Sequence, residues 1–308
     1  MSKAVVANGF GGPDVLEVID RPLPTPGAGQ VRVRVEAAAL NPVDVGVRVG
    51  AFGLTNLTEP YILGWDLAGV VDATGEGVTE WAIGQQVIGF VQWLQEFSGT
   101  HAEHVVVASD ALVAAPKSLS SAEAATLPLN TLTAVQALNL SGMTKGQTVV
   151  ITGAAGALGG YLTEAAAQRG LRVIAVARDT DRDWLRARGA ADVIERTDDL
   201  PAAVRALVPD GADGLLDPAA IGQAAIGAVR DGGVFVGAIP PLPVSERRIH
   251  VDRVEVVPNQ GQLAEIAAAA DRGEFTPRVA ELYPLDQAAA AHARQQRGNL
   301  RGRIVLVP

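Results

Sequence analysis

Residues 147–160, QTVVITGAAGALGG, combine a β-branched run, a glycine-rich turn and the start of an apolar segment. The run predicts a strand over 148–152, and the residues behind the turn predict a helix over 157–169. Against the dinucleotide fingerprint G-x-G-x-x-G, Gly156 and Gly159 stand at the second and third glycines, and Ala154 replaces the first. Gly156 lets the backbone approach a pyrophosphate, and Gly159 lets helix and strand pack closely.

This turn predicts an anion site at a helix N-terminus, where free backbone N–H groups and the helix dipole favour a pyrophosphate. The expected cofactor-binding residues of the turn are Gly153, Ala154, Ala155, Gly156, Ala157, Leu158 and Gly159. A tight turn that binds no ligand is the alternative interpretation. The strand before the turn and the helix after it favour the dinucleotide.

The next strand, expected over 172–176, ends beside a residue that can select the cofactor. An Asp or Glu about 20 residues past the glycines usually binds the ribose hydroxyl of NAD. Here Ala177 and Arg178 occupy the strand end, and Arg182 follows. A guanidinium pairs with a 2′-phosphate through two charge-assisted hydrogen bonds, so Arg178 and Arg182 predict NADPH. Asp179 leaves NADH open, and a solvated surface pair is the other interpretation of the two arginines.

Strands and helices alternate over the part of the chain that begins near residue 118. Strands are expected over 148–152, 172–176, 192–194, 214–216, 234–237 and 254–257, with helices over 157–169 and 181–188 between them. This alternation predicts an α/β fold with a doubly wound parallel sheet covered on both faces. Ser120, followed three residues later by Glu123, predicts a capped helix at the start of this part.

The strand expected over 234–237 adds a second expected contact with the cofactor. Its carboxyl end carries Gly237, Ala238 and Ile239. Ligands bind at that edge of a parallel sheet, so this backbone is expected to hold the carboxamide of the nicotinamide.

The two ends of the chain have a different texture. Strands separated by glycines are expected over 31–35, 67–71, 86–90 and 104–107, a spacing that predicts a small β-barrel or sandwich. The tail is expected to form helices over 262–270 and 285–296 and a closing strand over Arg303–Val307.

Composition excludes several classes of function. The chain has 308 residues, 48% of them hydrophobic and 19% charged, which predicts a folded core. A net charge of −9 argues against nucleic acids and anionic membranes as partners. The absence of cysteine excludes disulfides, thiolate nucleophiles and cysteine-bound zinc. With no signal-peptide pattern and no apolar run of about 18 residues, we expect a cytoplasmic protein.

Short motifs in a shared order produce a resemblance over nearly the whole chain. They are residues 39–44 (ALNPVD), 61–71 (YILGWDLAGVV), 99–104 (GTHAEH), 127–134 (LPLNTLTA), the turn at 153–159, and residues 301–306 (RGRIVL). In these motifs the chain resembles the quinone oxidoreductase branch of the medium-chain dehydrogenase/reductase superfamily. The resemblance implies a GroES-like β-barrel catalytic domain, residues 1–117 and 259–308. Between these two segments it implies a Rossmann domain, residues 118–258.

The resemblance also implies an activity, hydride transfer from NADPH to a quinone or an α,β-unsaturated carbonyl compound, by a homodimer. Zinc-containing relatives place a cysteine where Asn41 stands and Gly-His-Glu where Gly64, Trp65 and Asp66 stand. Asn and Trp are poor zinc ligands, and the four-cysteine structural lobe has no counterpart here. We therefore expect no metal, and activation of the acceptor by position and hydrogen bonding.

Three residues are expected to act in catalysis by the same resemblance. Asn41 is placed beside the nicotinamide ribose and the substrate, and Thr133 approaches the nicotinamide. Asn41 could donate an amide N–H to the developing enolate; the alternative is that it fixes the loop before Pro42, because Asn is a common turn former. Asp44 is expected to orient this loop, and as an acid it would need a raised pKa. Arg303 stands where relatives carry lysine and is expected to reach a phosphate.

Aromatic residues are scarce, at 4% of the chain, and most lie in the first 117 residues. Phe52, Trp65, Phe90 and Trp93 stand near expected loop or strand ends, so they are expected to line a substrate pocket. Relatives often carry a tyrosine near Phe52, which has no hydroxyl. Solvent is therefore expected to supply the proton that completes the reduction.

The four histidines suggest no metal site. His101 and His104 flank Glu103, but on a strand residues three apart point to opposite faces. His250 and His292 are isolated in the sequence and are expected at the surface.

Two alternatives to a general enone or quinone reductase stay open. The first is a catalytically weak NADPH-binding protein that acts as a sensor or partner. The second is a tailoring reductase of a biosynthetic pathway, because an aromatic pocket suits a flat, apolar substrate.

Overall fold

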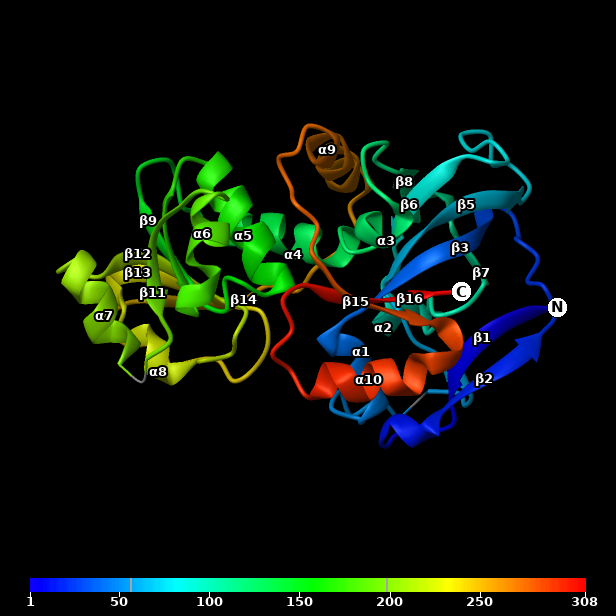
Figure 1. The fold of residues 1–308 in the computed structure, drawn as a ribbon, viewed down its shortest axis with the longest axis horizontal. Coiled ribbons are helices and arrows are strands. Elements are labelled where there is room, and N and C mark those ends of the chain that lie inside the picture. Colours follow the sequence, from blue (N-terminus) through cyan, green and yellow to red (C-terminus); the bar gives the residue numbers. More distant parts are fainter. Residues whose placement is uncertain (56, 198) are drawn as a thin grey trace. The chain divides into compact units, whose positions relative to one another are not determined.

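The computed structural model describes residues 1–55, 57–197 and 199–308. The chain divides into two compact units (Figure 1). Unit 1 comprises Met1–Leu129 and Val257–Pro308, and unit 2 comprises Asn130–Val256. Helix α3 (Ser121–Ala124) belongs to unit 1 and packs against its strands.

A six-stranded sheet forms the centre of unit 2, and each neighbouring pair of its strands is parallel. Its strands are β9 (Thr148–Ile151), β10 (Arg172–Ala177), β11 (Ala190–Glu195), β12 (Ala212–Asp217), β13 (Val229–Gly237) and β14 (His250–Arg253). Their spatial order, β11-β10-β9-β12-β13-β14, is the order 3-2-1-4-5-6 of doubly wound dinucleotide folds. The predicted parallel sheet is confirmed.

One strand of this sheet was placed wrongly by the sequence pattern. The sixth strand is His250–Arg253, not residues 254–257. His250–Arg253 is an edge strand that contains three polar residues beside Val251, and in the described sheet it pairs with β13. The more apolar residues behind it lead out of the sheet toward the boundary at Val257.

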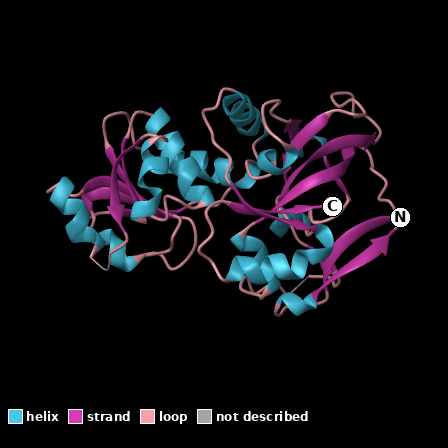
Figure 2. Cartoon of the chain, in the orientation of Figure 1, coloured by secondary structure: helices cyan, strands magenta, loops and turns pink. Residues whose placement is uncertain are grey.

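Helices cover both faces of the sheet, as Figures 1 and 2 show. Those of unit 2 are α4 (Pro128–Leu140, which begins in unit 1), α5 (Ala157–Gln168), η3 (Asp179–Asp181), α6 (Arg182–Arg186), α7 (Leu200–Leu207) and α8 (Gln223–Ile226). Helices α7 and α8 share a core cluster with Val150, Ile174 and Phe235 of the sheet. Helix α5 packs on β9 and β10, on the side away from α7 and α8.

The described residues of unit 1 form two sheets, of seven and three strands. The larger has the order β15-β16-β3-β5-β6-β8, with β7 paired to β3; the smaller has the order β2-β1-β4. The bounds are β1 (Ser2–Ala7), β2 (Leu16–Arg21), β3 (Gln30–Leu40), β4 (Tyr61–Ile62), β5 (Asp66–Thr74), β6 (Gln86–Phe90), β7 (His104–Ala108), β8 (Leu112–Ala114), β15 (Val279–Pro284) and β16 (Arg303–Val307). Both chain ends therefore build one sheet, because β16 pairs with β3.

Among the described residues of unit 1, the longest helices are α9 (Gln260–Asp271) and α10 (Ala288–Gln296), both in the C-terminal segment. The other helices of this unit are η1 (Pro13–Val15), α1 (Pro42–Arg48), α2 (Trp93–Glu96), η2 (Ser109–Ala111), α3 and η4 (Leu285–Gln287). Ser120 caps α3, and its side chain accepts a hydrogen bond from the Glu123 N–H, as predicted. Helix α10 packs against α1 and β16 and buries Ala288 and Ala291 against the strands.

Over the described part of the chain, no helix is both long and apolar enough to cross a bilayer.

Candidate active site

The glycine-rich turn of unit 2 joins β9 to α5 with almost no space for side chains. Gly153 has a φ of +53°, in the left-handed region that favours glycine. A Cβ on Gly159 would lie 2.2 Å from the Gly153 carbonyl oxygen, so only glycine allows this approach of helix and turn. Gly156 is the N-cap of α5, and the first turn of this helix has backbone N–H groups without intrahelical partners. The turn therefore has the local geometry of a phosphate-binding loop.

A buried polar pair ties this turn to the neighbouring central strand. The Thr152 hydroxyl donates to the Asp217 carboxylate, and both side chains are buried. The second oxygen of Asp217 accepts the Gly222 N–H at 2.9 Å, and its backbone oxygen accepts the Ala238 N–H at 3.3 Å. These residues lie where the strand order reverses between β9 and β12, which is the ligand-binding edge of a doubly wound sheet.

The end of β10 carries the charged residues that were expected to select the cofactor. Arg178 is exposed and follows Ala177 directly. The Arg182 guanidinium donates to the Asp179 carboxylate at 2.7 Å and to the Val193 carbonyl at 3.1 Å. Because Asp179 is already paired with a cation, its carboxylate is a weaker candidate for a ribose hydroxyl than the sequence suggested.

Asn41 and Asp44 lie in a fully buried polar cluster of unit 1 with Asp66. Asn41 is the N-cap of α1, and its backbone N–H donates to the Asp44 carboxylate at 2.7 Å. The Asn41 amide nitrogen donates to the Asp66 carboxylate at 2.7 Å and approaches the Ala39 carbonyl at 3.5 Å. The other Asp66 oxygen accepts the Leu129 N–H, in the first turn of α4, at 2.6 Å. Both N–H bonds of the Asn41 amide are thus directed at protein acceptors.

Burial changes the acidity of both carboxyl groups. It raises the pKa of Asp44 well above the usual value, although the Asn41 N–H works in the opposite direction. It raises the pKa of Asp66 to about 7, opposed by the hydrogen bonds from Leu129 and Asn41 and by the charge of Arg303. Asp44 therefore has the raised pKa that an acid at this place requires.

Arg303 is buried, and its positive charge lowers the pKa of both Asp44 and Asp66. Its guanidinium therefore faces buried carboxyl groups, and its expected reach to a phosphate stays a prediction. Thr133 lies in α4 and is half-buried. Gly237 ends β13, and Ile239 is 50% exposed.

Three of the four expected pocket aromatics are in the interior of unit 1. Trp65, Phe90 and Trp93 are almost fully buried, and Phe52 is exposed. Trp65 and Trp93 pack with ring centroids 5.4 Å apart, and the Trp93 indole N–H donates to the Ile62 carbonyl at 2.6 Å. Packing alone explains these three burials, and a contact with substrate stays a prediction for all four.

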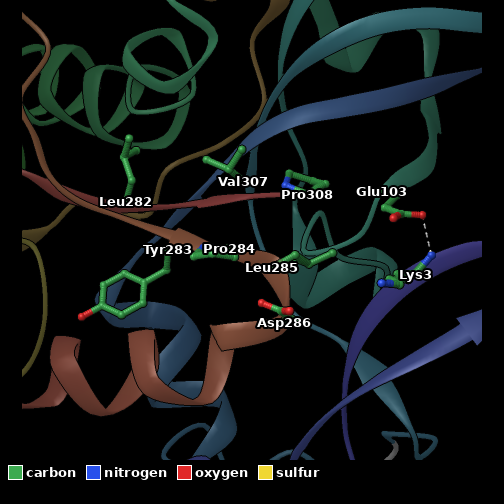
Figure 3. A pocket seen from close by; sticks show the side chains of 9 residues that line it. All are labelled: Lys3, Glu103, Leu282, Tyr283, Pro284, Leu285, Asp286, Val307 and Pro308. Carbon is green, nitrogen blue, oxygen red and sulfur yellow. Dashed lines mark hydrogen bonds between the residues drawn. The ribbon is translucent and has the colours of Figure 1, made fainter.

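A hollow of about 500 Å³ lies elsewhere in unit 1, beside the chain terminus (Figure 3). Lys3, Glu103, Tyr283 and Pro308 contribute to its lining, and the Lys3 N–H donates to Glu103 at 2.8 Å. None of the expected catalytic or pocket residues lines it.

The expectation that His292 lies at the surface is wrong, because it is fully buried, whereas His250 is exposed as expected. Arg48 donates to His292 Nδ1 at 3.3 Å, and the His101 and His292 rings meet edge to face with centroids 6.1 Å apart. Burial lowers the pKa of His101 to about 4 and that of His292 to about 2. Among the described residues, no three His, Cys, Asp or Glu side chains group to hold a metal.

Two residues of the site were not proposed from the sequence, although a signal for each existed. Asp66 is the last residue of Gly64-Trp65-Asp66, the segment that stands where zinc-containing relatives have Gly-His-Glu. Its position in that motif was the available signal. Asp217 directly follows the strand expected over 214–216, at the carboxyl edge where ligands bind. The side-chain donors to these two acids, Asn41 and Thr152, lie 25 and 65 positions away in the sequence.

Family models match both ends of the chain. The model of the alcohol dehydrogenase GroES-like domain matches residues 27–117, and the model of the zinc-binding dehydrogenase family matches residues 188–306.

Similar curated proteins include reductases of conjugated carbonyl compounds and of quinones. A 2-methylene-furan-3-one reductase of Solanum lycopersicum is 29% identical, over 97% of this chain and 77% of that protein. A quinone oxidoreductase of Sus scrofa is 28% identical, over 92% and 90%. An NADPH-dependent alkenal/one oxidoreductase of Arabidopsis thaliana is 28% identical, over 99% and 79%.

Solved structures with similar folds include alcohol dehydrogenases and quinone oxidoreductases. An NAD-dependent alcohol dehydrogenase has a TM-score of 0.90 and 32% identity, with 99% of both chains covered. A quinone oxidoreductase of Coxiella burnetii has a TM-score of 0.88 and 27% identity, with 100% of this chain and 99% of that one covered. A mycobacterial protein solved with NADPH has a TM-score of 0.87 and 25% identity, over 99% and 100%. With the family matches, these likenesses confirm the predicted fold class.

Proposed function

The chain belongs to the medium-chain dehydrogenase/reductase superfamily, and from this premise we propose that it reduces a quinone or an α,β-unsaturated carbonyl compound with NADPH, without a catalytic zinc. The observation that carries the proposal is the pairing of a dinucleotide turn in unit 2 with a zinc-ligand position occupied by Asn41 in unit 1. The named activities of the quinone and alkenal/one oxidoreductase relatives support the substrate class.

The residues of unit 2 fit a dinucleotide. The turn at 153–159 would hold the pyrophosphate on the N-terminus of α5, and the close approach of Gly159 to Gly153 sets the start of this helix directly against the turn. Gly237, Ala238 and Ile239, at the carboxyl end of β13, would hold the carboxamide. The cofactor supplies a hydride when it is bound. The neighbouring Thr152–Asp217 hydrogen bond keeps the turn in place.

The side chains at the positions of the zinc ligands are chemically unsuited to zinc. Asn41 and Trp65 stand at two positions where zinc-containing relatives have ligands, and an amide and an indole are poor donors to Zn²⁺. The chain has no cysteine at all. An acceptor must then be activated by position and hydrogen bonding rather than by a Lewis acid.

The roles of the chain's own residues follow from the buried cluster. Asn41 and Thr133 would position the reacting end of the cofactor, and Asp44 holds the Asn41 backbone by a 2.7 Å hydrogen bond. Both Asn41 amide N–H bonds are engaged, so donation to an enolate would require release of the bond to Asp66 or to Ala39. This favours solvent as the proton source over a protein amide.

The charged residues at the end of β10 favour NADPH over NADH as the cofactor. Arg178 is exposed there, and the ion pair between Arg182 and Asp179 neutralises the carboxylate that would favour NADH. Two relatives are described with NADPH, and one similar structure belongs to an NAD-dependent enzyme. Recognition of a 2′-phosphate by Arg178, with a contribution from Arg182, is therefore part of the proposal.

The proposed functional form of the protein is a homodimer. Strand β14 is an edge strand of its sheet, and Val244, in the segment before it, is 76% exposed. Unpaired strand edges and exposed apolar side chains favour association of chains. Light scattering coupled to gel filtration is expected to give twice the mass of one chain.

The test of the activity is a panel of acceptors with NADPH. We expect NADPH oxidation with 1,2-naphthoquinone or a simple enone such as 3-buten-2-one, and no reduction of saturated aldehydes. Tight NADPH binding without turnover on any acceptor would contradict a reductase. That result would support the second candidate, a catalytically weak NADPH-binding protein, which the complete burial of Asn41 favours.

A further inference from the structure

Asp66 is a fully buried acid at the start of β5. Each of its two carboxylate oxygens accepts a short hydrogen bond from a different segment. One accepts from the Asn41 amide nitrogen at 2.7 Å, and the other accepts from the Leu129 backbone N–H at 2.6 Å. The carboxylate thus connects the loop before α1 to the first turn of α4.

One of these two partners is an expected site residue, because Asn41 is expected at the reacting end of the cofactor. Leu129 is the second residue of α4 and belongs to unit 1, as Asn41 and Asp66 do. The carboxylate therefore anchors the Asn41 amide to the start of a helix within one compact unit.

The carboxylate is itself held in a fixed place. The backbone oxygen of Asp66 accepts the Thr100 hydroxyl at 2.7 Å, and the positive charge of Arg303 acts on its side chain. A carboxylate at a helix N-terminus also gains from the helix dipole. The buried carboxylate accepts one short hydrogen bond on each oxygen, so only one placement of the carboxylate satisfies both donors.

We propose that Asp66 is a positioning residue that fixes the Asn41 amide against the first turn of α4, so that Asn41 is held in one arrangement for hydride transfer. This inference rests on the proposed function, because it needs Asn41 at the reacting end of the cofactor. The carboxylate acts through its two donors, which occupy one oxygen each.

The variant Asp66→Asn tests the proposal at nearly constant volume. An amide offers one acceptor oxygen where the carboxylate offers two, so either Asn41 or Leu129 loses its partner. Loss of one hydrogen bond to a charged group predicts a fall in kcat of about tenfold to a hundredfold. The Kd of NADPH is expected to stay within about twofold, because the cofactor turn lies in unit 2 and is not altered.

Asp72→Asn is the matched control, because it makes the same change on the same strand. Asp72 is partly exposed and accepts from Arg32 at 2.8 Å, away from the buried cluster. Its kcat is expected to equal that of the wild type. An Asp66→Asn enzyme with wild-type kcat would overturn the proposal, and so would an equal loss of kcat in both variants.

Nuclear magnetic resonance reports on the position of the Asn41 amide independently of the enzyme's activity. In the folded Asp66→Asn protein, the side-chain NH₂ signal of Asn41 is expected to shift, and an unmoved signal overturns the proposal. If Asp66→Asn does not fold, hydrogen exchange of the wild type decides: Leu129 N–H must exchange as slowly as the core, and fast exchange overturns the anchor. A wild type that reduces no acceptor refutes the proposed function, while these two signals still decide whether Asp66 holds Asn41 and α4.

Discussion

At the scale of single residues, the site depends on buried polar groups that satisfy one another. Asn41, Asp44 and Asp66 are all fully buried, and each has a short hydrogen bond to another member or to the backbone. Asn41 and Asp44 were expected at the site from the family resemblance, and that expectation stays a prediction. Their neighbour Asp66 was not proposed, because the Asn41–Asp66 bond joins residues that are 25 positions apart.

Arg178→Ala tests the residue that we propose for cofactor selection. Removal of a charge-assisted contact with the 2′-phosphate predicts a rise in KM for NADPH of about tenfold to a hundredfold, with little change for NADH. Steady-state kinetics with both cofactors measure the ratio. The control is Arg172→Ala, at the opposite end of β10, where the guanidinium pairs with Asp192 at 2.8 Å. Equal effects of Arg178→Ala on both cofactors would refute recognition of the phosphate.

At the scale of elements, most strands and helices follow from local patterns. The strand Gln86–Phe90 and the strand Arg303–Val307 agree with the expected bounds at both ends, and α5 begins at the expected Ala157. Strand β14 is the exception. This edge strand pairs with one neighbouring strand, and it has fewer apolar residues than the segment that follows it, so the apolar pattern predicted the wrong residues. The burial of His292 escaped for a related reason, because its Arg48 partner lies 244 positions away.

Gly159→Ala tests the packing of turn and helix. The added Cβ would lie 2.2 Å from the Gly153 oxygen and 2.7 Å from Ala154 Cα, so the first turn of α5 must move. We expect a loss of about 1–3 kcal/mol in the free energy of unfolding and a weaker Kd for NADPH. Chemical denaturation and fluorescence titration measure the two effects.

Gly261→Ala, near the start of α9, is the control for this variant. Its Cβ would meet only Asn259 Oδ1, at 3.5 Å. The change from Gly to Ala is expected to stabilise the protein by about 0.4–1 kcal/mol. A Gly159→Ala protein with wild-type stability and cofactor affinity would show that the close approach has no importance for binding.

At the scale of the whole molecule, the two compact units could be anticipated only in part. The change of texture near residue 118 indicated two regions, and the resemblance implied that both chain ends form one domain. The pairing of β16 with β3, which joins those ends, leaves no local signal in the sequence. The order of the six parallel strands likewise depends on contacts between distant segments.

Acid stability of the whole protein provides a further test. His101 is buried and its pKa is lowered to about 4, so the unfolded chain binds the proton first as the pH falls. Its contribution to stability is complete above pH 6.5 and is lost toward pH 4, by up to about 3 kcal/mol. Asp44 and Asp66 act in the opposite direction, because their pKa values are raised and their protonated forms favour the folded state.

A comparison of variants separates these opposing effects. His101→Gln keeps a donor for the Ala39 carbonyl but does not titrate, so its unfolding free energy should fall less steeply than that of the wild type between pH 6.5 and 4. His250→Gln, at an exposed site, should follow the wild type. Parallel curves for His101→Gln and the wild type would contradict a buried neutral His101.

Turnover by metal-stripped enzyme tests whether the protein reduces its acceptor without a catalytic zinc. The protein is dialysed against a chelator, its zinc content is measured by mass spectrometry, and NADPH oxidation by 1,2-naphthoquinone is followed before and after. We predict the same kcat in both samples, with far less than one zinc per chain. A rate that falls on stripping and returns with added Zn²⁺ would contradict reduction without a metal.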